Sequence, residues 1–391
     1  MKARLLTILA AALVSGGCSG SGEPESSAPA PVTTAARGGD FYAVPDPLPP
    51  GRPGDLIRAE PAESPPGSRV WRVLYHSRAL DGRDIAVSGL VAAPAEPAPA
   101  GGYPVLAWAH GTTGLADPCA PSKEATFGRV PFHDYWLYGY VVAATDYEGL
   151  GTPGLHPYLV GASEGRSVLD AVRAARRLER SGAGRRAILF GHSQGGHAVL
   201  FAGEIAASYA PDVDLLGVVA AAPAAELLLL TRDVRRSAFS GYIPAAVAGF
   251  AAVYPDAQPE RVLTADALAD LGVVDEGCIG DVLGTYADED VLRPGVLERE
   301  PWRSRLIENT PGRAATPAPI LVVHGTEDEQ IPVSAARGLL ERLCRSGDTA
   351  AELRLYPGAA HIGVVRASEG DVLRWMAQRV TGARARTSCG R

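Results

Sequence analysis

A serine between two glycines gives this chain its first chemical signal. The pentapeptide Gly-His-Ser-Gln-Gly at 191–195 follows a short apolar run, 187–190, and precedes an alanine-rich stretch, 197–210. A serine in a tight turn between a buried strand and a helix is the layout of a nucleophile elbow. The glycines leave room for the strained turn that exposes the hydroxyl. The pattern therefore predicts a nucleophile at Ser193.

The pentapeptide alone is weak evidence, because a chain with 45 glycines can match it by chance. A second match, Gly-Ala-Ser-Glu-Gly, occupies 161–165. The segment before it, 156–160, is short and contains a proline, and it falls one strand too early for the partners described next. We therefore interpret Ser163 as the N-cap of a helix.

A serine nucleophile needs a base, and the base needs an orienting acid. Asp328 follows the apolar run 320–323, where an acid at the end of a central strand can reach a histidine. Its neighbours Glu327 and Glu329 compete for this role, and we favour Asp328 for its spacing after the strand. His361 follows the last predicted strand and is the only one of eight histidines located after both Ser193 and Asp328. The order Ser, Asp, His is that of the α/β-hydrolase architecture.

The oxyanion of an acyl-transfer reaction requires N–H donors. The sequence His-Gly-Thr-Thr-Gly at 110–114 follows the apolar run 104–109, and in this architecture that loop faces the nucleophile. We predict donors in the backbones of Gln194 and Thr112, with Thr113 as the alternative to Thr112. An ordinary glycine-rich turn is the competing interpretation of this loop.

The remaining pattern predicts elements that can hold these residues. Two alternating runs, 69–76 and 84–91, predict a hairpin around Asp-Gly. Strands and helices then alternate, which indicates a mixed, mostly parallel sheet with helices on both faces. Further strands are expected at 140–145, 215–222 and 351–356, and helices at 130–138, 163–180, 334–344 and 363–380.

The alternation is interrupted by a long, irregular apolar stretch. It is too long for a plain loop and predicts an inserted, mainly helical cap at about 224–310. Its apolar segments are short and broken by prolines, which argues against membrane spans. Large apolar residues gather there, at 227–230 and at Phe239, Tyr242 and Phe250, and they suggest a pocket for an acyl chain.

The N-terminus predicts export. A short positive segment and about ten apolar residues precede Cys18, so that residues 1–18 read as a signal peptide that resembles a bacterial lipoprotein signal. Lipidation of Cys18 would anchor the protein to a membrane, and ordinary cleavage nearby is the alternative. Residues 19–40 lack large apolar side chains and predict a flexible linker, which leaves 41–391 as the catalytic domain. The net charge of −7 argues against nucleic acid as a partner.

Four further cysteines stand at positions 119, 278, 344 and 389. An even number in an exported protein suggests two disulfides in one of three pairings, while four buried free thiols are the alternative.

Together these features resemble the secretory lipase family, the fungal lipase A-like enzymes and their bacterial relatives, from about Phe41 to the C-terminus. The resemblance rests on His-Gly-Thr-Thr at 110–113 with Cys-Ala-Pro-Ser at 119–122, on Thr-Asp-Tyr-Glu-Gly-Leu-Gly at 145–151, on Gly-His-Ser-Gln-Gly-Gly at 191–196, and on the loops of Asp328 and His361. It implies an α/β-hydrolase fold, a triad of Ser193, Asp328 and His361, and the disulfides Cys119–Cys278 and Cys344–Cys389. Asp146 is expected to brace a strand end.

The expected activity is hydrolysis of carboxylic esters of lipids through an acyl-enzyme on Ser193, with no cofactor or metal. The sequence leaves three alternatives: a serine peptidase or aminopeptidase, for which Glu226 is a candidate to hold a peptide terminus, a polysaccharide acetyl esterase, and a non-catalytic surface binding protein. The oligomeric state is not predicted.

Overall fold

The computed structural model describes residues 40–124, 139–346 and 350–390. The predicted signal peptide, nearly all of the predicted linker and the helix expected at 130–138 lie outside these residues. Within them, one nine-stranded sheet organises the chain, in the order β1-β2-β3-β5-β4-β6-β7-β8-β9.

The strands from β5 to β9 across the sheet run parallel, and the strands on the other side are antiparallel. Their bounds are β1 Leu56–Pro61, β2 Ser68–Arg78, β3 Asp84–Pro94, β4 Tyr103–Ala109, β5 Val141–Thr145, β6 Ala183–His192, β7 Asp214–Ala221, β8 Ile320–Gly325 and β9 Ala351–Tyr356. The predicted hairpin is confirmed as β2 and β3, which are longer than expected. Strand β1 was not predicted, because its sequence, LIRAEP, has only two large apolar residues, both at its start.

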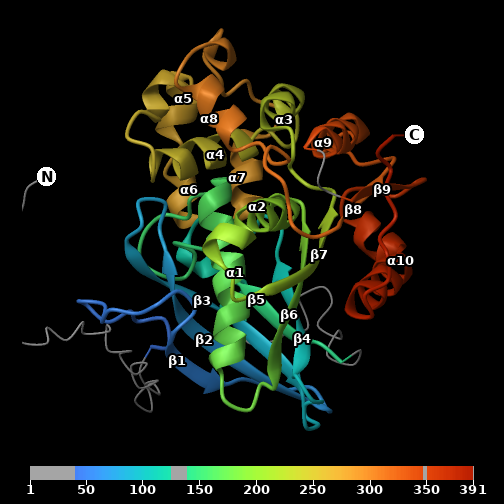
Figure 1. Ribbon diagram of the computed structural model, residues 1–391. Coiled ribbons are helices and arrows are strands. Elements are labelled where there is room, and N and C mark those ends of the chain that lie inside the picture. Colours follow the sequence, from blue (N-terminus) through green and yellow to red (C-terminus); the bar gives the residue numbers. More distant parts are fainter. Residues whose placement is uncertain (1–39, 125–138, 347–349, 391) are drawn as a thin grey trace, which may run out of the picture.

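Helices cover both faces of the sheet (Figure 1). Helices α1 (Gly161–Arg177), α2 (Gln194–Tyr209) and α9 (Val333–Arg345) pack on one face, and α10 (Gly363–Val380) packs on the other. Helix α10 has the bounds that the sequence predicted. Helix α2 begins three residues earlier than predicted, directly after Ser193.

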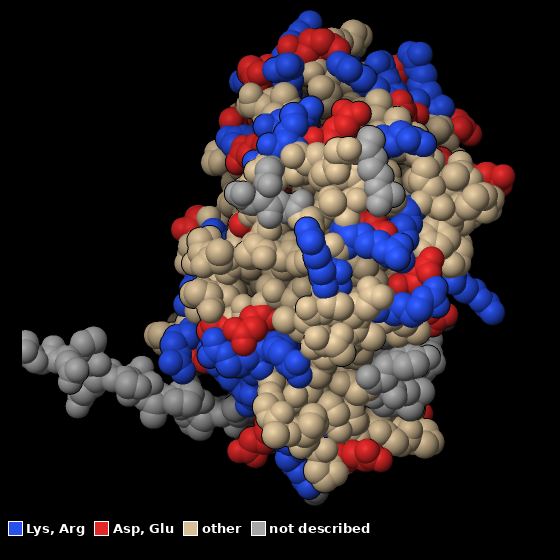
Figure 2. Space-filling model, turned by 45° about the vertical axis from the view of Figure 1, so that its right-hand side comes forward, with Lys and Arg blue, Asp and Glu red and all other residues tan. Residues whose placement is uncertain are grey.

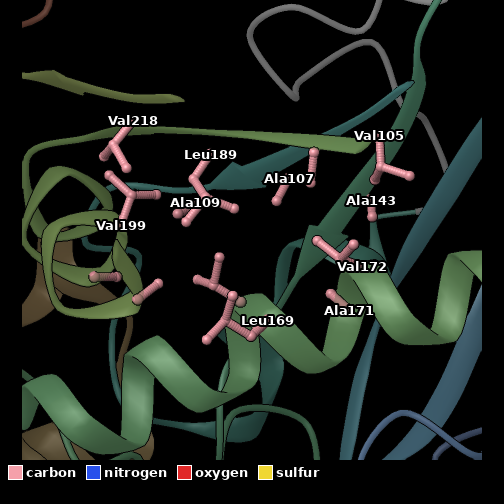
Figure 3. Close-up of a cluster of buried hydrophobic side chains, with 14 of the residues drawn as sticks. Val105, Ala107, Ala109, Ala143, Leu169, Ala171, Val172, Leu189, Val199 and Val218 are labelled. Carbon is pink, nitrogen blue, oxygen red and sulfur yellow. The ribbon is translucent and has the colours of Figure 1, made fainter. Parts of the chain in front are cut away.

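The central strands are buried on both sides because their side chains alternate between two cores. In β6, Leu189 belongs to the core beneath α1 and α2, whereas Phe190 belongs to the core beneath α10. Figure 3 shows the first of these cores, in which Leu189 and Val218 of neighbouring strands face Leu169 and Val199 of the two helices. Full burial of one such side chain contributes roughly 1.5–3 kcal/mol. This double burial fixes the strand ends that carry the site.

Between β7 and β8 the chain forms a separate helical layer at the top of Figure 1. We call residues 222–319 the cap segment. Its helices are α3 Leu227–Val234, α4 Tyr242–Ala251, α5 Ala265–Ala269, α6 Val273–Glu276, α7 Ile279–Tyr286 and α8 Trp302–Glu308. A hydrophobic cluster that includes Phe250, Tyr286 and Trp302 holds this layer together, and it continues into Leu115, Tyr158 and Ile331 outside the cap segment. No helix in the described part of the chain is long and apolar enough to cross a membrane.

Both disulfides implied by the family resemblance are present. Cys119–Cys278 joins the loop after β4 to the start of α7 in the cap segment, and Cys344–Cys389 joins α9 to the C-terminal residues. On the face shown in Figure 2, Lys and Arg are interspersed with Asp and Glu over the upper part of the molecule.

Candidate active site

Ser193 lies in the turn between β6 and α2 with φ 58° and ψ −117°, a conformation that few non-glycine residues adopt. The two flanking glycines are required by backbone contacts. A Cβ on Gly191 would lie 2.1 Å from the carbonyl oxygen of Gly195, and a Cβ on Gly195 would lie 1.9 Å from that of Ala109. The local geometry is therefore that of a nucleophile elbow, as the sequence predicts.

His361 and Asp328 meet at the ends of β9 and β8. The Nδ1 atom of His361 lies 2.8 Å from Oδ2 of Asp328, and both side chains are buried. The other oxygen of Asp328 accepts hydrogen bonds from the N–H groups of Gln330 and Ile331, at 3.0 and 2.8 Å. Burial raises the pKa of the Asp328 carboxyl, but the hydrogen bond from His361 and those N–H groups outweigh burial and hold the pKa below its ordinary value.

The two competing acids take other positions. Glu329 accepts a hydrogen bond from the backbone N–H of His361, at 3.1 Å, and Glu327 is exposed. Asp328 is therefore the carboxylate on the His361 ring. The fully buried His324 also approaches Asp328, at 3.5 Å, but its Nε2–H donates to the carbonyl of Ile331 at 2.9 Å.

His192, which precedes the serine, packs against His361. The two ring centroids are 4.7 Å apart, and Nε2 of His192 donates to the carbonyl oxygen of His361 at 3.0 Å. Burial, followed by the charge of His361, lowers the pKa of His192 to about 4, so that this ring is neutral at neutral pH. The contact holds the His361 loop against the elbow. Among the described residues, no hydrogen bond joins Ser193 Oγ to His361, a contact that is often long without substrate.

The loop after β4 faces the elbow. A Cβ on Gly111 would lie 3.6 Å from Cβ of Ser193, and the hydroxyl of Thr112 lies 2.9 Å from that of Tyr158. Thr113 is tied to the cap segment instead, because its carbonyl accepts from the N–H of Ile279 at 2.9 Å. Thr112 therefore lies beside Tyr158, whereas Thr113 lies against the cap segment.

Asp146 is fully engaged at the end of β5. Its carboxylate accepts from the hydroxyl of Ser88 at 2.6 Å and from the N–H of Ser122 at 3.0 Å, and it also contacts the hydroxyl of Ser122. These bonds attach the loop that contains Cys119 to the sheet, which is the bracing role expected for Asp146.

Ser193 is one of the residues that line an apolar cavity. Tyr158 and Ala224 stand with Ser193 among its lining residues, and its walls continue into the cap segment with Leu230, Phe250 and Trp302. Leu227 and Tyr242 also line it, as the sequence suggested, whereas Phe239 does not and packs at the edge of the cap cluster.

The pentapeptide at 161–165 forms the start of α1, and the N-cap interpretation of Ser163 is wrong. The helix begins at Gly161 with Val160 at the N-cap, so that Ser163 lies inside the first turn. Its hydroxyl donates to the carboxylate of Glu148 and therefore does not cap the helix. Next to it, the fully buried Glu164 contacts Gln194 at 2.8 Å and His197 at 2.7 Å.

Sequence reasoning missed this buried polar group behind the elbow. The available signal was an acid in a pentapeptide set aside as a chance match, together with two histidines not assigned to any role. His156 and His197 are both fully buried.

Among the described residues, no group of three or more His, Cys, Asp or Glu side chains is arranged to hold a metal ion.

The sheet order and the serine between β6 and α2 define an α/β-hydrolase fold. A solved structure of Candida antarctica lipase A shares it: the TM-score is 0.78 at 22% identity, over 90% of this chain and 87% of that one. Residues 134–388 match the family described as Secretory lipase, and the chain belongs to this family.

Individual relatives are distant. A secreted triacylglycerol lipase, LIP4 of Malassezia furfur, is 28% identical over 54% of this chain. The match spans 42% of that relative's length. A Mycobacterium tuberculosis protein named probable inactive lipase MT1628 is 26% identical over 88% of this chain and 82% of its own length.

Proposed function

We infer that this chain is a carboxylic ester hydrolase that acts on esters of lipids through an acyl-enzyme on Ser193. The observation that carries this proposal is the apolar cavity that is lined by Ser193 and by residues of the cap segment. A hydroxyl in the wall of an apolar cavity suits an ester whose acyl chain lies in the cavity. Family membership supports the same class of reaction.

In this proposal His361 removes the proton of Ser193 as the hydroxyl attacks the ester carbonyl. Asp328 holds the ring by Nδ1, so that Nε2 is free to accept the proton, and its carboxylate stabilises the imidazolium that forms. The backbone N–H groups of Gln194 and Thr112 would stabilise the oxyanion. His361 then protonates the leaving alcohol, and water attacks the acyl-enzyme by the reverse sequence.

The peptidase alternative loses its candidate for binding a peptide terminus. The carboxylate of Glu226 is paired with the guanidinium of Arg342, which also donates to the carbonyl of Ala225 at 2.5 Å. A polysaccharide acetyl esterase would need polar groups along its groove, whereas the wall residues named above are apolar. Neither alternative gains an observation in its favour.

We further propose that the protein is exported, in line with its predicted signal peptide and with the name of the Malassezia furfur relative. Lipidation of Cys18, and with it attachment to a membrane, remains part of the proposal. Mass spectrometry of the mature N-terminus would test it: an acylated Cys18 supports lipidation, and a cleaved, unmodified N-terminus contradicts it.

The activity is tested with p-nitrophenyl esters from acetyl to palmitoyl, together with a peptide amide and an acetylated polysaccharide. We expect hydrolysis of the lipophilic esters, with a fluorophosphonate probe attached to Ser193. Activity confined to the amide or the polysaccharide would contradict the substrate class. A protein that neither labels nor hydrolyses any ester would support the non-catalytic alternative.

A further inference from the structure

A buried carboxylate connects the two pentapeptides behind the elbow. Glu164 lies in the first turn of α1 and is fully buried. Its Oε1 accepts hydrogen bonds from Nε2 of Gln194 at 2.8 Å and from the N–H of Leu159 at 3.0 Å. Its Oε2 lies 2.7 Å from Nδ1 of His197, which is also fully buried. A carboxylate removed from water is costly unless it is paired and hydrogen-bonded, and every contact here meets that need.

The hydrogen-bond directions follow from the partners. The Nε2 atom of His197 faces the carbonyl oxygen of Asn309 at 2.8 Å and must donate to it. Its Nδ1 and Oε2 of Glu164 therefore share one proton. The second hydrogen of the Gln194 amide goes to Nε2 of His156 at 2.7 Å. That atom can accept, because Nδ1 of His156 donates to the carbonyl of Glu148 at 2.8 Å.

The side chain of Gln194 is thus held by two buried acceptors, Glu164 and His156. Gln194 is also the residue whose backbone N–H is proposed to stabilise the oxyanion. Such donors are effective when they are fixed before the reaction and do not reorganise during it. Anchoring the side chain limits the rotation of the peptide unit that carries this N–H.

We propose that Glu164 is a positioning residue for the reaction at Ser193, and that it acts by holding Gln194 so that the Gln194 backbone N–H points to the oxyanion. The inference rests on the proposed function and adds a residue to its machinery. Glu164 is fully buried and is not one of the residues that line the cavity, so it does not touch a substrate there.

The same network reaches the cap segment. The side-chain oxygen of Asn309, at the end of α8, accepts from the N–H of Gly161 at 2.9 Å, and its amide nitrogen lies 3.1 Å from the hydroxyl of Tyr254. Asn309 therefore joins the start of α1, His197 of α2 and the cap segment. The side chain of Gln194 is therefore linked to α1 through Glu164 and, through His197 and Asn309, to the cap segment.

The test compares Glu164→Met, Glu164→Gln and Gln194→Met with the unchanged chain. Glu164→Met and Gln194→Met each remove the hydrogen bond between the side chains of residues 164 and 194. Each should lower kcat by about 10- to 100-fold with little change in KM. Glu164→Gln can accept from Gln194 and donate to Nδ1 of His197, and it should recover most of that loss. Combining Glu164→Met with Gln194→Met should add little, because both changes remove the same contact.

Asp170 provides the matched control. It is also a fully buried carboxylate on α1, bonded to Ser77 and Tyr209, but it is remote from Gln194. Asp170→Asn should lower the unfolding midpoint and retain kcat per folded molecule, whereas a merely structural role for Glu164 would make the two positions behave alike.

The rates are normalised to folded protein by near-UV circular dichroism. If folded Glu164→Met has the kcat of the unchanged chain, the inference is overturned. If Glu164→Met does not fold, the same result in Gln194→Met overturns it. Failure of the proposed function would look different, because the unchanged chain would then hydrolyse no lipophilic ester, or ester hydrolysis would survive Ser193→Ala.

Discussion

The chain contains the pattern Gly-x-Ser-x-Gly twice, at 161–165 and at 191–195, and the two copies fold differently. In the second copy the serine occupies the turn between β6 and α2 at positive φ. In the first copy the serine lies within the first turn of α1, where its hydroxyl contacts the carboxylate of Glu148. The same spacing of residues thus gives a partly exposed candidate nucleophile in one place and a buried helical turn in the other.

The glycines of the two copies are needed for different reasons. In the elbow, a side chain would collide with backbone carbonyl groups, which cannot move without disturbing the strand or the turn. In α1, a Cβ on Gly161 would lie 2.2 Å from the ring of Phe201, and one on Gly165 would lie 2.9 Å from the N atom of Ala202. These glycines allow α1 to pack closely on α2. Close packing brings Glu164 to Gln194, so the first copy supports the second.

The largest expected effect separates the two serines. Ser193→Ala should lower kcat for p-nitrophenyl esters by about 10⁶-fold, because loss of the nucleophile leaves only the oxyanion donors and binding. Ser163→Ala should keep kcat per folded molecule and lose about 1–3 kcal/mol of unfolding free energy, since the Glu148 carboxylate loses a partner. Steady-state kinetics with urea unfolding measures both. A large loss of kcat in Ser163→Ala, with kcat retained in Ser193→Ala, would contradict the assignment of Ser193 as the nucleophile.

Alanine at the glycines should separate the two copies by stability. Gly195→Ala meets the carbonyl oxygen of Ala109 and should cost more than about 4 kcal/mol, or prevent folding. Gly161→Ala meets the partly exposed ring of Phe201, which can rotate, and should cost about 1–3 kcal/mol. Urea unfolding midpoints compare the two variants. Equal losses of unfolding free energy in the two variants would contradict the claim that Gly195 tolerates a side chain less well than Gly161.

A smaller effect concerns the pH dependence of the contact between His156 and Gln194. Burial lowers the pKa of His156 to about 4, from an ordinary value near 6.5. The unfolded chain then binds more protons between these values, so that stability is lost as pH falls from about 6.5 to 4. The loss should be about 3 kcal/mol. His156→Gln should flatten this part of the profile, and identical slopes in the two proteins would contradict a neutral His156.

Much of the site could be predicted because its parts are local and ordered along the chain. Each of Ser193, Asp328 and His361 follows an apolar run that becomes a strand, and parallel strands bring their carboxyl ends to one edge of the sheet. The same reasoning placed the loop of Thr112 against the elbow. The sequence favours Thr112 over Thr113, but it does not contain their contacts with Tyr158 and Ile279, which join residues far apart along the chain.

The sequence by itself determined the type of fold, the candidate triad residues and the existence of a cap, since periodicity and turn residues act over a few neighbours. Only the tertiary structure decided what the first pentapeptide does. The buried carboxylate of Glu164 is stabilised by Gln194 and His197, and His156 holds the other side of the Gln194 amide. These residues come together through the packing of α1 on α2. Burial and pairing of charge depend on contacts across the fold, which a local pattern does not contain.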